Sequence, residues 1–250
     1  GKKAVITVLG SDFKLLEVPG MKSALRSVLK TNRCIIAPNA EWMTEDLESF
    51  FGDLCPITPL PFGIDDRWYR VQRKEPNLQA LKWLVVSRLT EKKLGSLFSW
   101  GSEVFNNPLN ELHLVGPNQE NIKIPSWVHY HGAASPTQLA QEHFPEASSL
   151  ITLSKHCEGR PQVMLEALAA GIPIIASDIK AHSDFIENGE NGYLVNSQES
   201  FLSRLQQLST QEINGTISAN ARFYAKNTYG NWHECGNRFQ ELYRQLEAQA

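Results

Sequence analysis

Short apolar runs alternate with helical patterns over most of the chain. Eight runs rich in aliphatic and aromatic residues are Ala4–Leu9, Cys34–Ala37, Trp83–Ser87, Leu112–Val115, Trp127–Tyr130, Leu150–Leu153, Ile172–Ala176 and Tyr193–Val195. Most are continuously apolar, as expected of parallel strands that are covered on both faces. The segments between several of them carry apolar residues at helical spacing, for example at Met21, Leu25 and Val28. The alternation predicts an α/β fold with a doubly wound parallel sheet.

The pattern changes at two places. After Val195 only helical patterns follow, over Leu202–Leu208, Ile213–Tyr224 and Trp232–Leu246, each with apolar residues three and four positions apart. Earlier, Cys55–Gly63 carries three prolines, which favour a stiff extended segment because proline restricts itself and the residue before it. We therefore place the best domain boundary of the chain in this proline-rich segment.

Composition excludes several classes of protein. The 250 residues are 42% hydrophobic and 20% charged, with 24 basic against 27 acidic side chains and a net charge of −3. A nucleic-acid-binding protein usually has an excess of basic residues, and this chain has none. The most apolar stretch, Ala167–Ala176, is far shorter than the roughly 20 residues that span a bilayer. Four scattered cysteines, Cys34, Cys55, Cys157 and Cys235, favour reduced thiols in a cytosol over a metal site or a disulfide framework.

The residues with the most informative spacing lie between Leu150 and Ser177. A strand ends near Leu153, a loop carries Glu158, Gly159 and Arg160, and Pro161 and Gly171 bracket a helix predicted over about Gln162–Ala170. The helix N-terminus then lies at the carboxyl edge of the sheet, where doubly wound folds bind ligands and free N–H groups attract anions. Gly159 would let a diphosphate approach the backbone closely.

Two carboxylates flank this predicted anion site. Glu158 precedes the helix and Glu166 lies about a turn and a half inside it, so both can face one cavity. Carboxylates accept hydrogen bonds from hydroxyl groups, which indicates a ligand with sugar hydroxyls beside its phosphates. The alternative is a solvated Glu158 and a Glu166 paired with a surface lysine. For the two residues together, at this spacing, we favour the ligand.

A second candidate lies after the strand Trp83–Ser87. Arg88 and Lys93 flank the turn into the next helix, and two fixed cations there could neutralise a diphosphate leaving group. Basic residues between a strand and a helix are, taken alone, usually just a solvated loop.

Together these motifs resemble those of one large family. The segment Glu158-Gly-Arg-Pro-Gln-Val-Met-Leu-Glu166-Ala, followed by Ala170-Gly-Ile-Pro, resembles the two-glutamate signature of the retaining GT-B glycosyltransferases of group 1. Matching pieces follow the family's order: Ser87-Arg-Leu with Lys93, Leu112-His-Leu-Val-Gly-Pro, Val128-His-Tyr-His-Gly, Glu187-Asn-Gly-Glu-Asn-Gly-Tyr-Leu-Val and Tyr229-Gly-Asn-Trp. The resemblance covers essentially all of the chain after Phe62.

The resemblance implies a nucleotide-sugar donor domain and a role for each matching residue. Arg88 and Lys93 would bind the diphosphate and Glu158 would orient the transferred sugar, and these three are the catalytic candidates. Glu166 would bind the ribose, and the backbone of Gly159, Arg160, Pro161, Gln162 and Val163 would hold phosphate and sugar. Gly132 and Ala133 would lie near the base. The family's favoured mechanism is front-face retention without a metal or other cofactor.

The chain departs from the family in its N-terminal part. Many relatives carry a histidine near the reacting sugar, just before Gly-Ser-Asp, where this chain has Leu9 before Gly10-Ser11-Asp12. The resemblance makes Gly10 a further substrate-binding candidate. The segment before Pro61 is predicted to hold only two strands and two helices, less than an ordinary domain. We therefore expect an incomplete Rossmann-like acceptor-side domain at 1–62, a donor domain at 63–228, and a C-terminal helix at 229–250 that returns to the first domain.

The expected partners are a nucleotide-sugar donor and a glycan or glycolipid acceptor. An alternative function is a nucleotide-sugar-binding subunit, or an inactive fragment, that needs a partner for the missing N-terminal half; an epimerase or phosphorylase is ranked lower. The resemblance also implies a cytoplasmic protein with peripheral membrane contact through a basic face, for which scattered solvated lysines are an equally good explanation. The basic residues concerned are Lys2, Lys3, Lys14, Lys22, Arg26, Lys30 and Arg33.

Overall fold

The computed structural model describes residues 2–77, 80–156 and 158–248. Its internal contacts divide the chain into two compact units. The first unit comprises 1–63, 157–161 and 229–250, and the second comprises 64–156 and 162–228. The chain thus passes from one unit to the other at four points.

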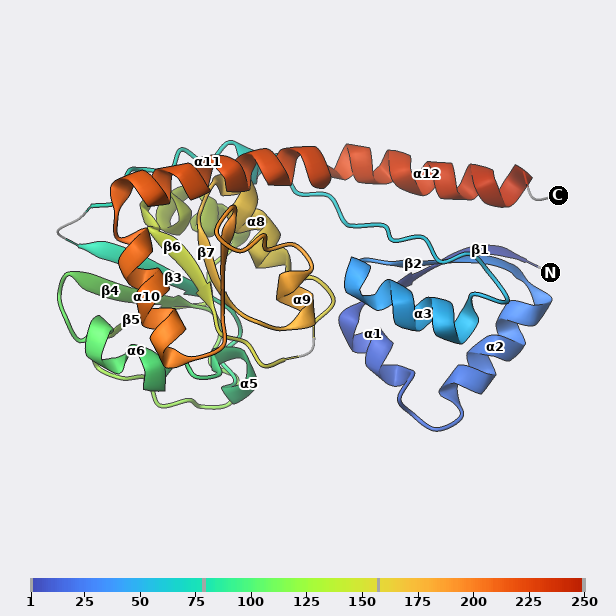
Figure 1. Ribbon diagram of the computed structural model, residues 1–250, viewed down its shortest axis with the longest axis horizontal. Coiled ribbons are helices and arrows are strands. Elements are labelled where there is room, and N and C mark those ends of the chain that lie inside the picture. The colour runs from blue at the N-terminus through green and yellow to red at the C-terminus, as the bar shows by residue number, and fades with distance from the viewer. Residues whose placement is uncertain (1, 78–79, 157, 249–250) are drawn as a thin grey trace. The chain divides into compact units, whose positions relative to one another are not determined.

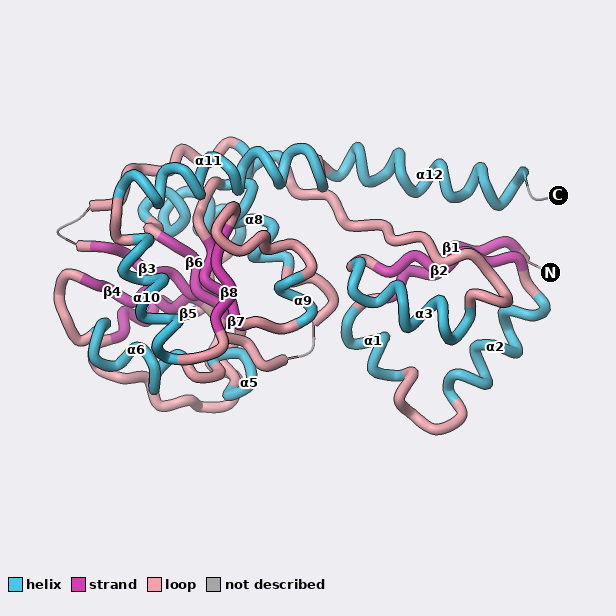
Figure 2. Tube along the Cα trace, viewed as in Figure 1, coloured by secondary structure: helices cyan, strands magenta, loops and turns pink. Residues whose placement is uncertain are grey.

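The second unit is built on a parallel sheet of six strands (Figures 1 and 2). The strand order is β5-β4-β3-β6-β7-β8. Their bounds are β3 Leu81–Val86, β4 Asn110–Val115, β5 Val128–Gly132, β6 Ser149–Thr152, β7 Ile174–Ser177 and β8 Gly192–Val195. Every neighbouring pair is parallel. The structure confirms the predicted doubly wound α/β fold, with a strand at each of the predicted runs.

Helices cover both faces of this sheet. On one face α6 (Leu97–Phe105) and α10 (Gln198–Leu208) enclose a core that includes Trp83, Leu112 and Ile175. On the other, α8 (Gln162–Ala170) contacts β7, and both α11 (Gln211–Thr228) and α4 (Asp66–Tyr69) pack against α8. The shorter elements are α5 Glu91–Leu94, α7 Pro136–Gln138, η2 Leu139–His143, η3 Phe144–Glu146 and α9 Lys180–Ser183.

The expectation of continuously buried strands is wrong for two of the six. In β4, Leu112 and Leu114 are buried, whereas Glu111 and His113 point to the opposite face. Strand β5 has no buried position, and His129 and His131 are exposed at alternate positions. The connection from β5 to β6 is a series of short helical turns, so this part of the sheet carries one polar face.

The first unit contains a two-stranded parallel sheet, β1 (Lys3–Val8) and β2 (Arg33–Pro38). Three helices lie in the same part of the chain, α1 Gly10–Leu15, α2 Met21–Thr31 and α3 Thr44–Phe51, together with the turn η1 Glu41–Met43. The prediction of two helices there is therefore wrong. It missed α1, whose six residues are too few to show an apolar period.

The last helix, α12 (Trp232–Ala248), belongs to the first unit and contacts both of its strands. Alternate residues of β2 face different cores. Cys34 and Ile36 pack with the residues of α2 and α3, whereas Ile35 and Ala37 pack with Leu242 and others of α12. Strand β2 is consequently covered on both faces by segments far apart in the sequence.

Several expectations from composition can be compared with the structure. The helices that it describes include none long and apolar enough to cross a membrane. The described cysteines, Cys34, Cys55 and Cys235, are buried free thiols, and Cys157 lies outside the described residues. Among the residues described, no three His, Cys, Asp or Glu side chains are grouped so that they could hold a metal ion.

Candidate functional site

The candidate site of the second unit lies where the strand order reverses. The chain adds β4 and β5 on one side of β3, then returns to start β6 on its other side and continues outward through β7 and β8. Beyond the carboxyl ends of β3 and β6, the flanking loops therefore diverge. Doubly wound sheets bind their ligands in the crevice at such a point.

The loop after β3 carries the two predicted cations. Arg88 is exposed, and Lys93 is half-buried in the first turn of α5. Thr90 is the N-cap of this helix, and its Oγ1 accepts a hydrogen bond of 3.2 Å from the Lys93 backbone N–H. This bond fixes the turn, so the position of the Lys93 backbone relative to β3 is set by local sequence.

The loop after β6 is held from both sides. The Ser177 hydroxyl, at the end of β7, donates to the carbonyl of Ser154 at 2.6 Å. The Lys155 backbone N–H donates to the carbonyl of Lys92 at 2.8 Å. Gly95 approaches so closely that a Cβ there would lie 2.0 Å from the Leu153 carbonyl oxygen, at a φ of +55° that favours glycine. The loops on the two sides of the switch point therefore support each other.

Helix α8 begins at the same edge of the sheet. It spans Gln162–Ala170, which confirms the prediction, and Gly171 follows in the left-handed region with φ +71°. The Gly171 N–H bonds to the carbonyl of Leu168 and the Ile172 N–H to that of Ala167, so the end of the helix is closed as expected. Gln162 and Val163 supply its first turn, where backbone N–H groups have no partner within the helix.

Glu166 is half-buried in α8 and strongly perturbed. Burial raises its pKa to about 7, because the charged carboxylate is poorly solvated. Arg67 opposes this rise, whereas Asp65 adds to it. The Arg67 guanidinium is itself engaged by Asp65, with Nε 3.0 Å from Oδ1. Within the described residues Glu166 has no ion pair with a lysine, so the alternative of a Glu166–lysine surface pair finds no support.

A cavity of about 480 Å³ opens beside the α4 residues that influence Glu166. Its lining combines carboxylates and guanidinium groups from α4 and its two cap residues with side chains of α7 and η2. The lining residues are Asp65, Asp66, Arg67, Arg70, Thr137, Ala140 and Gln141.

Close backbone contacts hold the ends of β3, β4 and β5 together. A Cβ on Gly116 would lie 1.8 Å from the Ser87 carbonyl oxygen, and Gly116 has a φ of +142° that only glycine adopts readily. The Gly116 N–H donates to the carbonyl of Gly132 at 2.7 Å. Gly132 has a φ of +71°, and Ala133 after it is exposed. Of the two predicted base-binding residues, Gly132 thus ends the last strand of this edge and Ala133 follows it.

The remaining predicted residues belong to the first unit. Gly159 is buried, and a Cβ on Gly10 would lie 1.9 Å from the Gly159 nitrogen. The indole of Trp42 donates from Nε1 to the Gly159 carbonyl at 2.9 Å. A Cβ on Gly159 would lie 2.6 Å from Oδ1 of Asn39, a residue only 5% exposed. The backbones at Gly10 and Gly159 thus lie so close together that a side chain at either position would clash with the other segment.

Three further predicted residues, Glu158, Arg160 and Pro161, lie beside Gly159 in the sequence. The Arg160 guanidinium carbon lies 5.0 Å from the ring centre of the buried Tyr229, a cation–π arrangement that holds the side chain against the first unit. Glu158 is half-buried, and Pro161 is buried immediately before α8. Glu158 and Glu166 belong to different units, so the expectation that both face one cavity stays a prediction.

Sequence reasoning missed two sets of residues. Asn39 and Trp42, which contact Gly159, follow the buried run of β2, and polar groups at a strand end were a signal that could have found them. The histidines of β4 and β5 form the other set. His129 and His131 occupy alternate positions of β5. His113 and His131, with His143 of η2, line a second cavity of about 240 Å³.

The second unit has the doubly wound sheet and the switch-point loops of a ligand-binding α/β domain, and sequence comparison identifies its family. The model of the family described as "Glycosyl transferases group 1" matches residues 80–211. Because the match covers more than half of the chain, this protein belongs to the group 1 glycosyltransferase family. The predicted family is confirmed, and every predicted site residue except Gly10 lies inside the matched region.

Individual relatives match more weakly. The chain is 28% identical over 134 residues to lipopolysaccharide 1,6-galactosyltransferase of Salmonella typhimurium, covering 46% of this chain and 36% of that protein. It is 24% identical over 201 residues to alpha-monoglucosyldiacylglycerol synthase of Acholeplasma laidlawii, covering 69% of this chain and 50% of that protein. The aligned parts of the chain span about half or less of these curated relatives.

The fold also matches solved structures. The structure of Anabaena Alr3699/HepE in complex with UDP and glucose superposes with a TM-score of 0.75, at 13% identity, covering 96% of this chain and 71% of that one. At this identity the likeness concerns the fold alone.

Proposed function

We propose that the protein transfers a sugar from a nucleotide-diphosphate donor to a glycan or glycolipid acceptor, with retention at the anomeric carbon. One observation carries this proposal. Arg88, Lys93 and the N-terminus of α8 all follow strands at the switch point of the second unit, inside the region that matches the family. Two cations and a helix N-terminus at such an edge suit a diphosphate.

The chemistry requires that negative charge be stabilised as the donor breaks. The bond between the anomeric carbon and the diphosphate oxygen breaks, the acceptor oxygen forms the new bond on the same face, and its proton passes to the departing diphosphate. We assign the stabilisation of that charge to Arg88 and Lys93, without a metal ion. Glu158 orients the transferred sugar and Glu166 binds the ribose. Gly10 lies near the reacting sugar, and Gly132 and Ala133 lie near the base.

UDP is the first nucleotide to test, because a structure with the same fold contains UDP and glucose. Binding of UDP, GDP and ADP is measured by calorimetry, and donor hydrolysis with the corresponding sugars. Lys93→Ala should weaken binding of the nucleoside diphosphate itself, whereas Glu158→Ala should slow transfer with nucleotide affinity nearly intact. Lys123→Ala is the matched control, an exposed lysine remote in sequence from these loops. The reverse ordering of the first two variants contradicts the role assignment.

Two other results would change the conclusion. If no nucleotide binds at millimolar concentration, the donor-site proposal fails for this chain. If nucleotide binds but no sugar is released or transferred, the observation favours a nucleotide-sugar-binding subunit that acts with a partner.

We also propose that the first unit contacts the surface of a membrane that carries the acceptor. Exposed apolar side chains gather on α1, α2 and the turn between them, at Leu15, Val18, Met21 and Val28. The exposed lysines Lys14 and Lys30 flank them, and such a mixture suits an anionic lipid surface. Sedimentation with anionic vesicles should fall for Leu15→Ser with Val28→Ser. Equal sedimentation of the variant, or none by the unaltered protein, contradicts this contact.

A further inference from the structure

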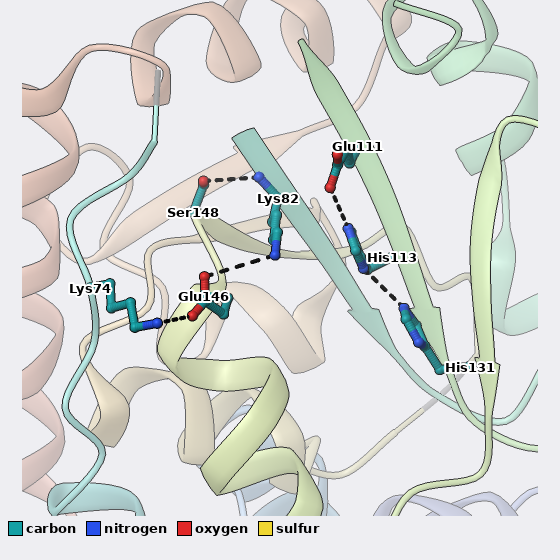
Figure 3. Close-up of polar contacts among 7 residues, drawn as sticks. All are labelled: Lys74, Lys82, Glu111, His113, His131, Glu146 and Ser148. Atoms are coloured by element: carbon teal, nitrogen blue, oxygen red, sulfur yellow. Dashed lines mark hydrogen bonds and ion pairs between the residues drawn. The ribbon is translucent and has the colours of Figure 1, made fainter. Parts of the chain in front are cut away.

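A group of histidines lies on the polar face of β4 and β5, apart from the loops described above (Figure 3). His113 of β4 is directly opposite His129 of β5 in the strand register. The Nδ1 atom of His113 is 2.9 Å from Nε2 of His131, and its Nε2 is 2.9 Å from Oε2 of Glu111. One hydrogen-bonded row therefore connects Glu111, His113 and His131.

The row has a definite arrangement of protons when both rings are neutral. The Glu111 carboxylate can only accept, so Nε2 of His113 carries the hydrogen and Nδ1 of His113 is the acceptor. His131 must then donate from its Nε2. A single added proton can still be placed, if His113 becomes a cation and His131 changes to the tautomer that accepts at Nε2. A second proton would set two N–H donors against each other at this distance, so the bond breaks.

The neighbouring histidine rings also oppose the uptake of protons by this pair. The ring centres of His113 and His129 are 4.9 Å apart, those of His113 and His131 are 5.1 Å apart, and those of His131 and His143 are 4.9 Å apart. Burial lowers the pKa of His113, His131 and His143, and the neighbouring imidazoles lower those of His113 and His131 further. Neutral rings at this spacing stack, whereas charged rings repel.

Other charged groups face this row from the elements around it. Those of opposite sign to an imidazolium are Glu111 on β4, Glu142 on η2 and Glu146 on η3. Lys82 on β3 is a cation that opposes the protonation of His113 and His131. Both Lys82 and Lys74 form ion pairs with Glu146. The carboxylate nearest to His113 raises its pKa, but less than burial lowers it. The balance therefore favours neutral rings at neutral pH.

The row is connected to the end of an edge strand. Among the described strands, β5 pairs with β4 alone, and the register between them shifts after Leu114. His131 immediately precedes Gly132, whose carbonyl accepts the Gly116 N–H, and the Tyr130 hydroxyl donates to the Gly116 carbonyl at 3.0 Å. A strand held on one side only moves more easily than a central strand when a side-chain bond beside it breaks.

We propose that the His113–His131 pair is a proton-sensitive support for the loop after β5, so that acidification loosens Gly132 and Ala133 and weakens nucleotide binding there. The regulatory part of this proposal rests on the proposed function. The structural part, that protonation of this pair loosens β5, does not.

Two measurements test the two parts separately, each from pH 7.5 to pH 5.5. The first is hydrogen exchange of the β5 amides without ligand, expressed at each pH relative to the intrinsic exchange rate, which itself falls as the pH falls. The second is calorimetric binding of UDP. His131→Gln keeps a donor at the position of Nε2 and cannot take up a proton. His233→Gln, an exposed histidine on α12, is the matched control. Protonation of UDP affects all three proteins equally, so it drops out when their dissociation constants are compared at the same pH.

Relative to the intrinsic rate, we expect faster exchange in β5 at pH 5.5 than at pH 7.5, and so lower protection, for the unaltered chain and for His233→Gln. The protection of β5 in His131→Gln should be unchanged. We expect the UDP dissociation constant of the unaltered chain to rise by about fivefold more than that of His131→Gln, at the lower end of usual coupling between sites. Identical exchange in all three proteins overturns the proposal. Faster exchange with no UDP binding at any pH supports the proton-sensitive strand and contradicts the proposed function. If exchange in β5 is faster at pH 5.5 but the UDP dissociation constant changes equally in the unaltered chain and in His131→Gln, the regulatory part alone is overturned.

Discussion

The two halves of the six-stranded sheet bury their strands differently. In β6 and β7 nearly every side chain is buried, since helix α8 packs on one face and the core of α6 and α10 lies on the other. In β4 and β5 the face toward η2 and η3 is polar and carries His113, His129 and His131. The difference teaches that coverage by the connecting segment, and not the parallel pairing itself, decides whether a strand is continuously apolar.

The largest expected effect is a loss of stability when a side chain is shortened in β6 or β7, the covered half of the sheet. Ile175 of β7 is fully buried, so Ile175→Ala should lower the free energy of unfolding by about 3 kcal/mol through lost burial and a residual cavity. His129→Ala on the polar half should change it by less than about 0.5 kcal/mol. Urea unfolding of the two variants measures both. Similar losses at the two positions would show that the halves do not differ in this way.

The next effect concerns charge in the covered half. The pKa of Glu166 is raised to about 7 from 4.5, so the folded chain loses stability as the pH rises through that interval. Glu166→Gln should therefore increase the free energy of unfolding by about 2 kcal/mol at pH 8, with no gain below pH 4.5. Unfolding is measured at several pH values, with Glu103→Gln on the exposed side of α6 as control. A gain that persists in acid contradicts the assigned cause.

The polar half should respond to pH with the opposite sign. The pKa values of His113 and His131 are lowered from 6.5, so stability is lost as the pH falls below that value. The bond to His113 lowers the pKa of Glu111, and Glu111→Gln should cost about 1 kcal/mol at pH 7. This cost should vanish in acid, where the Glu111 carboxylate is protonated in both states. Thermal unfolding against pH gives the comparison, and a constant cost would refute the charged hydrogen bond.

The smallest expected effect is at the rim of the polar half. Lys74 pairs with Glu146, but the Lys74 side chain is 68% exposed. Lys74→Met should change the free energy of unfolding by no more than about 0.5 kcal/mol, because solvent screens the pair. The same measurement at high salt should show no further difference. A loss above about 1 kcal/mol would indicate that the polar half depends on this ion pair.

The sequence predicted the elements best where local signals were strong. Pro161 and Gly171 bracket α8, and the structure has the helix at the predicted residues. The eight apolar runs located every strand. The short helix α1 escaped notice because six residues show no period, and the polar alternation in β4 was overlooked because Leu112, Leu114 and Val115 dominate that run.

The candidate site was predicted only in part, for a physical reason. The order of residues along the chain placed Arg88, Lys93 and Gly132 after parallel strands, and that suffices to place them at one edge. It could not reveal the contact of Trp42 with Gly159, which joins segments 117 positions apart. Nor could it reveal that burial perturbs Glu166, since solvation depends on α4 packing against α8.

The place of α12 in the first unit bears on how the chain is synthesised. Strand β2 leaves the ribosome before α12, yet one of its faces is covered by Leu242 and Leu246 of that helix. The second unit contains no segment beyond residue 228 and can close its core first. Until α12 has been synthesised, Ile35 and Ala37 on that face of β2 therefore lack this cover and can be reached by chaperones and proteases.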